Sequence, residues 1–484
     1  MIRLTIASLL AFGLCLDASA QAQAPRRVDV APTTLDALIA SSLAHFPEIL
    51  ATSAEVEGRQ QLAFAAEGAF DPRIEGGAGY LAGNQDAQSL DAGVYQDLPF
   101  ANARLFAGYD LADKDSPGYD YAELAGDKRE ARVGFSVSLL RDRAIDQRRA
   151  AITSTRLDVR SEQQQLTLER LRVLQQAYVT YAQWLLATRL HDSYAELLKL
   201  AEDRGVALER RVAAGDAPEI LLAENRQAIL QRQGLLVDAQ RQIDMAAEAV
   251  AFYLRDEQGA TVYPRYSSEL ELPVENPADF DVPVEELLDR VLALRPEISS
   301  ARIAREQAGL KLQLAENLGK PRVDLRFYTA RGSRDGLTGY EGTDQVVDLM
   351  FAIPLRTREA RGKASAAHAE MATLDYRIRQ MNDQVELDIR RALVNLDATR
   401  QLEDFAINEL ALSETLATAE SRRFDAGLSD FFLLNIRERQ VGEAQLKRWQ
   451  AHLAHHVALA SFYVVSMNLE GLGVRSDAAA GGAF

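Results

Sequence analysis

The sequence contains few cysteine, proline or aromatic residues and no long apolar run. Cys15 is the only cysteine among 484 residues, which excludes a disulfide framework and a cysteine-rich metal site. Only 14 prolines and 7% aromatic residues, beside abundant Ala, Leu, Glu, Gln and Arg, favour long helices. No apolar stretch reaches the roughly 18 residues that a membrane-spanning helix needs. The sequence therefore predicts a helical protein without a helical membrane anchor.

The sequence also lacks the short motifs of common enzymes. It has no phosphate-binding loop, no nucleophile elbow, no HExxH and no glycine-rich dinucleotide loop. We therefore expect no enzymatic activity and no cofactor, which speaks against a secreted enzyme. The net charge of −17 argues against nucleic acid as a partner, because phosphate binding needs a basic face.

Residues 1–20 have the pattern of a secretory signal peptide. Arg3 precedes an apolar run, and Ala18-Ser19-Ala20 offers a small-x-small cleavage site, with a second candidate ending at Ala22. Cys15 lies inside this segment, behind Leu14 rather than the small residue that lipoprotein processing requires. We expect an exported mature chain that has no thiol.

The chain contains two copies of one pattern. Leu38–Ile49 returns as Leu287–Ile298, 249 positions later, and Arg210–Leu222 returns as Arg422–Leu434, 212 positions later. The difference places an insertion of 37 residues (249 − 212) in the first copy. Two units of this length exclude a short-period solenoid. Each unit is predicted to be a helix, two strands, and a helix–turn–helix.

Apolar and polar residues alternate within 71–140 and within 322–355, which predicts strands. Runs of about 9 or 10 residues fit strands that cross a bilayer at a tilt. If so, Asp324, Arg326 and Asp348 face a lumen. The positions expected to face lipid are Val323, Leu325, Phe327, Val347, Leu349, Phe351 and Ile353. A half-buried hairpin of a soluble domain would give the same alternation.

Long helices flank these strands. A first helix is expected over 34–66 with a break at Pro47. Residues 143–211 and 359–425 are free of proline, and the first of these shows the 3–4 spacing of a coiled-coil seam. The aromatic residues of this stretch are expected to pack in that seam: Tyr178, Tyr181, Trp184 and Tyr194. Each long helix should stop at a glycine, Gly215 or Gly427, and return as a second helix.

These features together resemble the TolC-type outer-membrane factors, over roughly residues 34–467. The resemblance rests on the Pro-Glu-Ile pair at Pro47 and Pro296, the Ala-Gly tips, and the strand Phe351-Ala352-Ile353-Pro354-Leu355 that leads into a helix. It implies a mainly α fold with a membrane β-barrel portion, made of two tandem repeats. Three protomers would each give four strands to one 12-stranded outer-membrane barrel, and long coiled-coil hairpins would form a periplasmic α-barrel.

The resemblance also implies a function and partners. The chain would be a passive homotrimeric export duct in outer-membrane lipid, with most of its mass in the periplasm. It would serve a tripartite efflux pump or a type I secretion system, joined through a periplasmic adaptor to an inner-membrane transporter. The residues expected to dock the adaptor are Arg210, Arg211, Ala214, Gly215, Asp216, Arg422, Arg423, Ala426, Gly427 and Leu428. For the arginines, a simple preference for helix C-termini is an equal alternative.

Two departures from the family pattern stand out. Residues 89–96 and 103–111 are additional β-like segments, for which we favour a long extracellular hairpin over extra wall strands. At the positions where relatives often carry aperture acids, the chain has Leu433 and Ile436, which leaves Asp430 as the nearest acidic candidate.

His452, His455 and His456 share one helix face, a spacing that can hold a metal, but no acidic or cysteine partner is near in sequence and we expect no metal. The expected division of the chain is a signal peptide at 1–20, a first copy at 34–255, a linker at 256–283, a second copy at 284–467 and a disordered tail at 468–484. The leading alternative function is a soluble periplasmic coiled-coil scaffold whose strands form a small cap.

Overall fold

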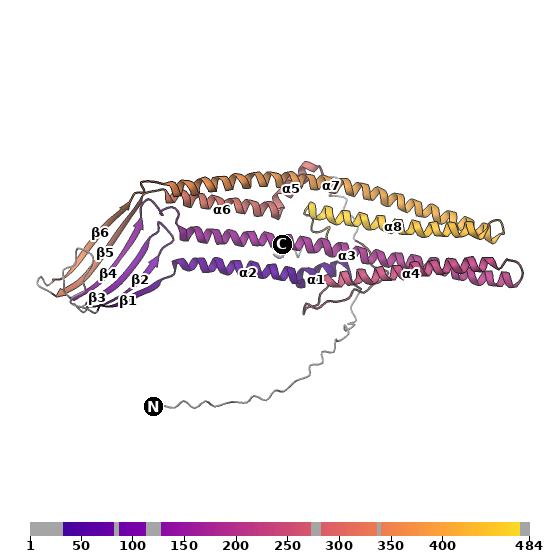
Figure 1. Cartoon of the computed structure of the whole chain (residues 1–484), viewed down its shortest axis with the longest axis horizontal. Helices are drawn as coiled ribbons and strands as arrows, with labels where there is room; N and C mark the ends of the chain where they lie inside the picture. Colours follow the sequence, from indigo (N-terminus) through magenta and orange to yellow (C-terminus); the bar gives the residue numbers. More distant parts are fainter. Residues whose placement is uncertain (1–31, 82–86, 113–126, 273–281, 336–339, 475–484) are drawn as a thin grey trace, which may run out of the picture.

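The computed structural model describes residues 32–81, 87–112, 127–272, 282–335 and 340–474. The expected signal peptide and the last ten residues of the tail lie outside this part. The molecule is elongated, with a sheet at one end and the turns of two helical hairpins at the other (Figure 1). Within the described residues, no helix combines the length and apolarity that crossing a membrane requires.

Each copy begins with a short helix that is interrupted at a proline. In the first copy, the single residue Phe46 separates α1 (Leu35–His45) from α2 (Pro47–Glu67). In the second, α5 (Val284–Leu294) is followed in the same way by α6 (Pro296–Leu318). A proline has no N–H to donate, but at the first position of a helix that donor has no partner to lose. The predicted break at Pro47 is confirmed.

Two long hairpins contain the longest helices of the structure. In the first copy, α3 (Gln147–Ala213) returns as α4 (Ile220–Tyr253), and in the second α7 (Arg358–Asp425) returns as α8 (Phe431–Val465). The seam aromatics are buried as predicted, since Tyr178, Tyr181, Trp184 and Tyr194 are at most 6% exposed.

Between the sheet and the tips, the helices lie side by side in one layer, four at each level, as their contacts show (Figure 1). In the half next to the sheet, α3 contacts α2 and α6, and α6 contacts α7. In the other half, α4 and α8 continue the positions of α2 and α6, so that α3 contacts α4 and α8, and α8 contacts α7. The result is a wall rather than a compact bundle.

The largest core lies where these two halves meet. Trp184, Ile298 and Leu459 belong to one buried cluster that draws on both copies. Leu270 from the expected linker joins this cluster, and so do Leu472 and Val474. The expectation of disorder from residue 468 onward is therefore wrong for 468–474, where the alternating apolar residues reach the core.

The strands form one antiparallel sheet in the order β1 (Arg73–Leu81), β2 (Ala87–Asp97), β3 (Arg104–Ala112), β4 (Asp127–Ser138), β5 (Arg322–Asp335) and β6 (Tyr340–Ala352). β2 and β3 are paired along their length with β1 and β4. The preference for an extracellular hairpin is thus wrong, because the extra segments are wall strands. In the part of the chain that the structure describes, one protomer contributes six strands, not the four that the resemblance implied.

Candidate functional site: a two-faced sheet and two helical tips

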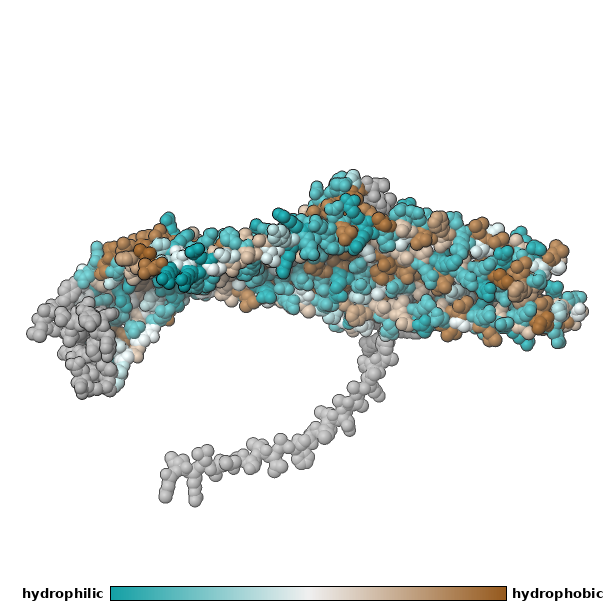
Figure 2. Space-filling view, turned by 45° about the horizontal axis from the view of Figure 1, so that its top comes forward, coloured by the Kyte–Doolittle hydropathy of each residue, from teal (hydrophilic) through white to brown (hydrophobic). Residues whose placement is uncertain are grey.

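One face of the sheet is apolar and open to the surroundings. Val347, Leu349, Phe351 and Ile353 are 60–73% exposed, and they alternate along β6 and its extension with residues of the opposite face, such as Asp348. The register sets Val347 beside Phe327 of β5, and Phe327 beside Phe135 of β4. Hydrophobic side chains gather over this end of the molecule, next to the start of the helices (Figure 2). Val323, Leu325 and Phe327 share the face by alternation but are less exposed.

The first copy carries the same face, which the sequence analysis had not assigned residue by residue. Ile74, Val94, Leu105 and Val133 are 47–81% exposed and fall on the same side by register. A soluble hairpin would cover one face of the sheet, whereas here the apolar face has no cover from the described residues. A broad exposed apolar surface marks a membrane or an interaction site.

The opposite face is polar and hollowed. A cavity of about 330 Å³ lies over it, and Asp97 and Asp324 are only 2% and 6% exposed. Asp97 binds three guanidinium groups, with N···O distances of 2.6 Å to Arg73, 2.7 Å to Arg104 and 3.1 Å to Arg148. Such charge-assisted bonds hold these long side chains against the polar face of the sheet.

Arg326, expected to face a lumen, lies on this polar face. Its guanidinium carbon is 4.9 Å from the ring centre of Phe106 and 4.8 Å from that of Tyr328, so it contacts both aromatic rings, whose planes are tilted by 54° to each other. Cation–π contacts of this kind attract a guanidinium to neighbouring rings. Its cross-strand partner in the register is Asp348, the other expected lumen residue.

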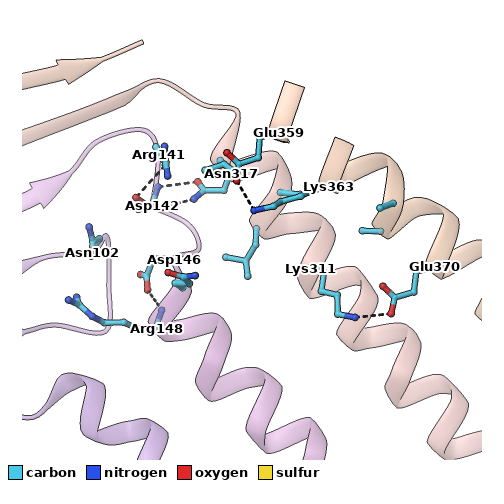
Figure 3. Close-up of a pocket in the computed structure, with 16 residues that line it drawn as sticks. Asn102, Arg141, Asp142, Asp146, Arg148, Lys311, Asn317, Glu359, Lys363 and Glu370 are labelled. Atoms are coloured by element: carbon cyan, nitrogen blue, oxygen red, sulfur yellow. Dashed lines mark hydrogen bonds and ion pairs between the residues drawn. The ribbon is translucent and has the colours of Figure 1, made fainter. Parts of the chain in front are cut away.

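The sheet meets the helices at a junction with a hollow of about 750 Å³ (Figure 3). Asn317 at the end of α6 exchanges two hydrogen bonds with Asp142, at 3.0 Å and 2.7 Å. Lys311 binds Glu370 at 2.8 Å, and Lys363 binds its own-helix neighbour Glu359 at 2.7 Å. These charges pair with one another, so the hollow has no strong preference for a charged ligand.

The two tips at the far end are built alike. In the first, the N–H of Asp216 donates to the carbonyl of Arg211 at 2.8 Å, and Gly215 has a φ of 79°. In the second, the N–H of Leu428 donates to Arg423 at 2.8 Å, and Gly427 has a φ of 72°. This is the Schellman arrangement, which needs a left-handed residue that glycine supplies most easily. The predicted glycine stops are confirmed.

Most of the expected docking residues lie exposed at these turns. Arg210, Ala214, Asp216, Arg422 and Ala426 are exposed, whereas Arg211 is half-buried. Arg211 lies 5.9 Å from the ring centre of Phe424, and in this way the first tip touches the second. Apolar side chains are exposed beside them, with Leu428 71%, Phe432 70% and Ile220 61% exposed.

The aperture candidates lie at the start of α8. The Asp430 carboxylate accepts the N–H of Leu433 at 2.7 Å, so this acid caps the helix. Leu433 and Ile436 are half-buried. Their role in an aperture stays a prediction, since one chain shows no facing copy.

A buried charge cluster lies behind the tips and joins the two copies. Glu438 of α8 is 4% exposed and binds Arg204 of α3 and Arg232 of α4, at 2.9 Å and 2.5 Å. Burial opposes ionisation of the Glu438 carboxyl, but the bonds and charges of the two arginines outweigh it and hold its pKa below the ordinary value. No sequence signal could have found this cluster, because Glu438 is more than 200 residues away from either arginine.

The three histidines lie near the central core, each with a partner from another helix. His452 is 2.5 Å from Glu403, His456 is 2.9 Å from the Tyr178 hydroxyl, and His455 is 3.3 Å from Thr399. Glu403 lies on α7 and was missed as a partner. Among the described residues, no group of three or more potential ligands has the geometry to hold a metal ion.

Comparison with known proteins shows a likeness in structure alone. No family model matches the sequence, and no curated protein matches it. The outer-membrane protein VceC of Vibrio cholerae has 16% identity and a TM-score of 0.61, with 91% of this chain and 96% of that chain covered.

Two further solved structures are similar. The open state of the Neisseria gonorrhoeae MtrE outer-membrane channel has 15% identity and a TM-score of 0.63, over 89% of this chain and 88% of that one. The Campylobacter jejuni CmeC outer-membrane channel has 14% identity and a TM-score of 0.61, over 91% and 86%. The chain therefore has the fold of the TolC-type outer-membrane factors, as its sequence pattern predicted.

Proposed function

We propose that the protein is a passive export duct of the outer membrane. It would conduct substrates from a periplasmic adaptor and an inner-membrane transporter to the exterior, within a tripartite efflux pump or a type I secretion system. The single observation that carries this proposal is the two-faced sheet, apolar and exposed outside, polar and hollowed inside, set on one end of a wall of long helices. The similar structures include proteins described as outer-membrane channels.

The division of the sheet into two faces supports a place in lipid. In a bilayer every backbone polar group must be paired, so a sheet survives there only as a closed barrel. One chain leaves the outer edges of β1 and β6 unpaired within the described residues. We propose that three copies close the barrel and that their helices form a tube below it.

The tips supply the proposed contact with the adaptor. They lie at the end opposite the sheet, and they expose arginines beside apolar residues such as Leu428 and Phe432. A group of exposed apolar residues beside polar ones indicates a docking surface. The chain itself would have no catalytic activity, and the energy for transport would come from the inner-membrane partner.

Fractionation and one tip variant test this function. The mature protein should be found in the outer membrane and need detergent for release; recovery from the periplasm without detergent would favour the soluble scaffold instead. Gly427→Trp should abolish export while trimers and membrane insertion remain, because the tip is far from the sheet. Normal export by this variant would remove the tips from the adaptor contact. Glu443→Trp, at an exposed position of α8 beyond the tip, is the matched control and should export normally.

A further inference from the structure

The sheet of one chain is two strands wider than the family pattern implied, and this inference rests on the function proposed above. The added strands are β2 and β3, both in the first copy, where the sequence carries its insertion. They pair residue by residue with β1 and β4, from Arg73↔Tyr95 at one border to Arg104↔Ser136 at the other. The insertion therefore enlarges the wall itself.

The free edges of this sheet fit a second copy of the same chain. Strand directions alternate from β1 to β6, so β6 of one copy can pair with β1 of the next as one more antiparallel neighbour. Ile74 of β1 and Val347 of β6 point to the same apolar face, so the face continues across such a border. Repeated head-to-tail pairing closes into a ring and leaves no edge.

The widths of the two halves of the protomer can be compared. Four helices abreast, at 8–10 Å between axes, span about 32–40 Å of circumference. Six strands about 4.8 Å apart, tilted by about 40°, span about 38 Å, whereas four would span about 25 Å. Six strands therefore match the helical wall, and four would narrow the duct where it enters the membrane.

We propose that three copies close a barrel of eighteen strands, three times the six of one chain, whose bore equals that of the helical tube beneath it. The backbone diameter of such a barrel is about 36 Å, against about 24 Å for twelve strands of the same tilt and spacing. Because the match holds within each protomer, it does not depend on how many copies form the ring.

The inner face is arranged to keep this bore clear. Arg73, Arg104 and Arg148 bind Asp97, and Arg326 contacts the rings of Phe106 and Tyr328, so these long polar side chains are held at the face of the sheet. With a side-chain layer of about 5 Å on each wall, about 26 Å remains free, compared with about 14 Å for twelve strands. An α-helix is about 10–12 Å wide. The barrel would admit a polypeptide as wide as a helical hairpin, where a twelve-stranded barrel admits one helix.

Electron cryo-microscopy of the detergent-extracted full chain tests the strand count directly. The expected cross-section shows three protomers and eighteen strands. Twelve strands would overturn the inference, whether they come from a dimer or from a trimer whose β2 and β3 have left the wall.

Polymer exclusion gives a second, independent reading. Polyethylene glycols added on the barrel side of a planar bilayer should enter the wild-type channel up to a diameter of about 26 Å. Deleting residues 87–112, which removes β2 and β3 and keeps the alternation of direction, should lower this limit roughly two-fold. Replacing residues 113–126 by a short Gly/Ser turn is the matched control, since it removes sequence of the same region but none of the described strands, and should leave the limit unchanged.

Membrane insertion and the polymer size limit test different claims. Protein that never enters the membrane contradicts the proposed function. Protein that inserts but excludes polymers above about 14 Å contradicts only the eighteen-stranded barrel.

Discussion

The two copies agree in their helices and differ in their strands. Their long helices have 67 and 68 residues, and their tips have the same hydrogen bonds and the same left-handed glycine. Their sheets, in contrast, contribute four strands and two. Helices that run side by side in one layer must begin and end at the same level along its long axis. The lengths of the two long helices are therefore coupled. Strands add to a sheet sideways, so a hairpin can be inserted in one copy without disturbing the other.

The contacts between the copies show what this coupling depends on. Near the tips, Glu438 of the second copy binds two arginines of the first, and near the centre His456 of the second copy bonds to Tyr178 of the first. The copies thus form one wall through polar contacts at two heights, in addition to their shared core.

The largest effect is expected from removing the acid that joins the copies. Glu438→Ala leaves the buried Arg232 and the largely buried Arg204 without this counter-charge, which should cost about 3–5 kcal/mol of unfolding free energy. Thermal unfolding of the purified protein, followed by tryptophan fluorescence, measures this. The control Glu443→Ala removes an exposed acid from the same helix and should have almost no effect. Equal stability of both variants would mean that the buried cluster does not join the copies.

Next comes the apolar face, which should be equivalent in both copies. Val347→Arg in β6 and Val133→Arg in β4 each place a charge near the middle of the sheet, where a mid-bilayer arginine costs about 2–4 kcal/mol. Phe351→Arg, near the end of β6, should cost less. Folding into lipid vesicles under urea gives these values. An inner-face change, Asp348→Asn, should be mild; a cost equal to that of Val347→Arg would contradict the assignment of the faces.

A smaller effect is expected from pH at the central contact. Burial, with the nearby His452 and His455, lowers the pKa of His456 to about 3, while an unfolded histidine has a pKa near 6.5. The folded state therefore stays neutral where the unfolded state takes up a proton, and stability falls as pH drops below about 6.5. The loss should reach about 2 kcal/mol at pH 5. His456→Gln should remove this slope, and His368→Gln, at an exposed position, should keep it.

The smallest effect concerns the tips. Alanine at Gly215 or Gly427 meets no atom within 4 Å of the added Cβ, so only the positive φ opposes it. Each change should cost about 1 kcal/mol and speed amide exchange at that turn roughly five-fold. Clearly unequal values would mean that the tips differ in backbone strain as well as in sequence.

Local patterns in the sequence were enough for most of the fold. Pro47, Gly215 and Gly427 mark the ends of helices because their backbone preferences act locally, and the alternation of Val347 to Ile353 marks a strand with two faces. The pairing of residues 89–111 was not readable in this way, since a hairpin and two wall strands share one local pattern. Only the register with β1 and β4 distinguishes them.

The candidate site was readable only in part for the same reason. The tip residues are close in sequence and could be named from it. Glu438 and its arginines, or Glu403 beside His452, meet only when helices from different copies pack together. The tail could not be predicted either. Leu472 and Val474 lie in a glycine-rich sequence, which favours disorder, yet both side chains are buried in the main core.

The central claim is that one chain runs from the cell exterior at the sheet to the periplasm at the tips. With Cys15 inside the expected signal peptide, single cysteines can be introduced into a mature chain that has none. Glu341→Cys, at the far end of β6, should react with a membrane-impermeant maleimide on intact cells. Asp216→Cys, at the first tip, should react only after the outer membrane is permeabilised. Equal labelling of both positions on intact cells, or labelling of neither, would contradict the account.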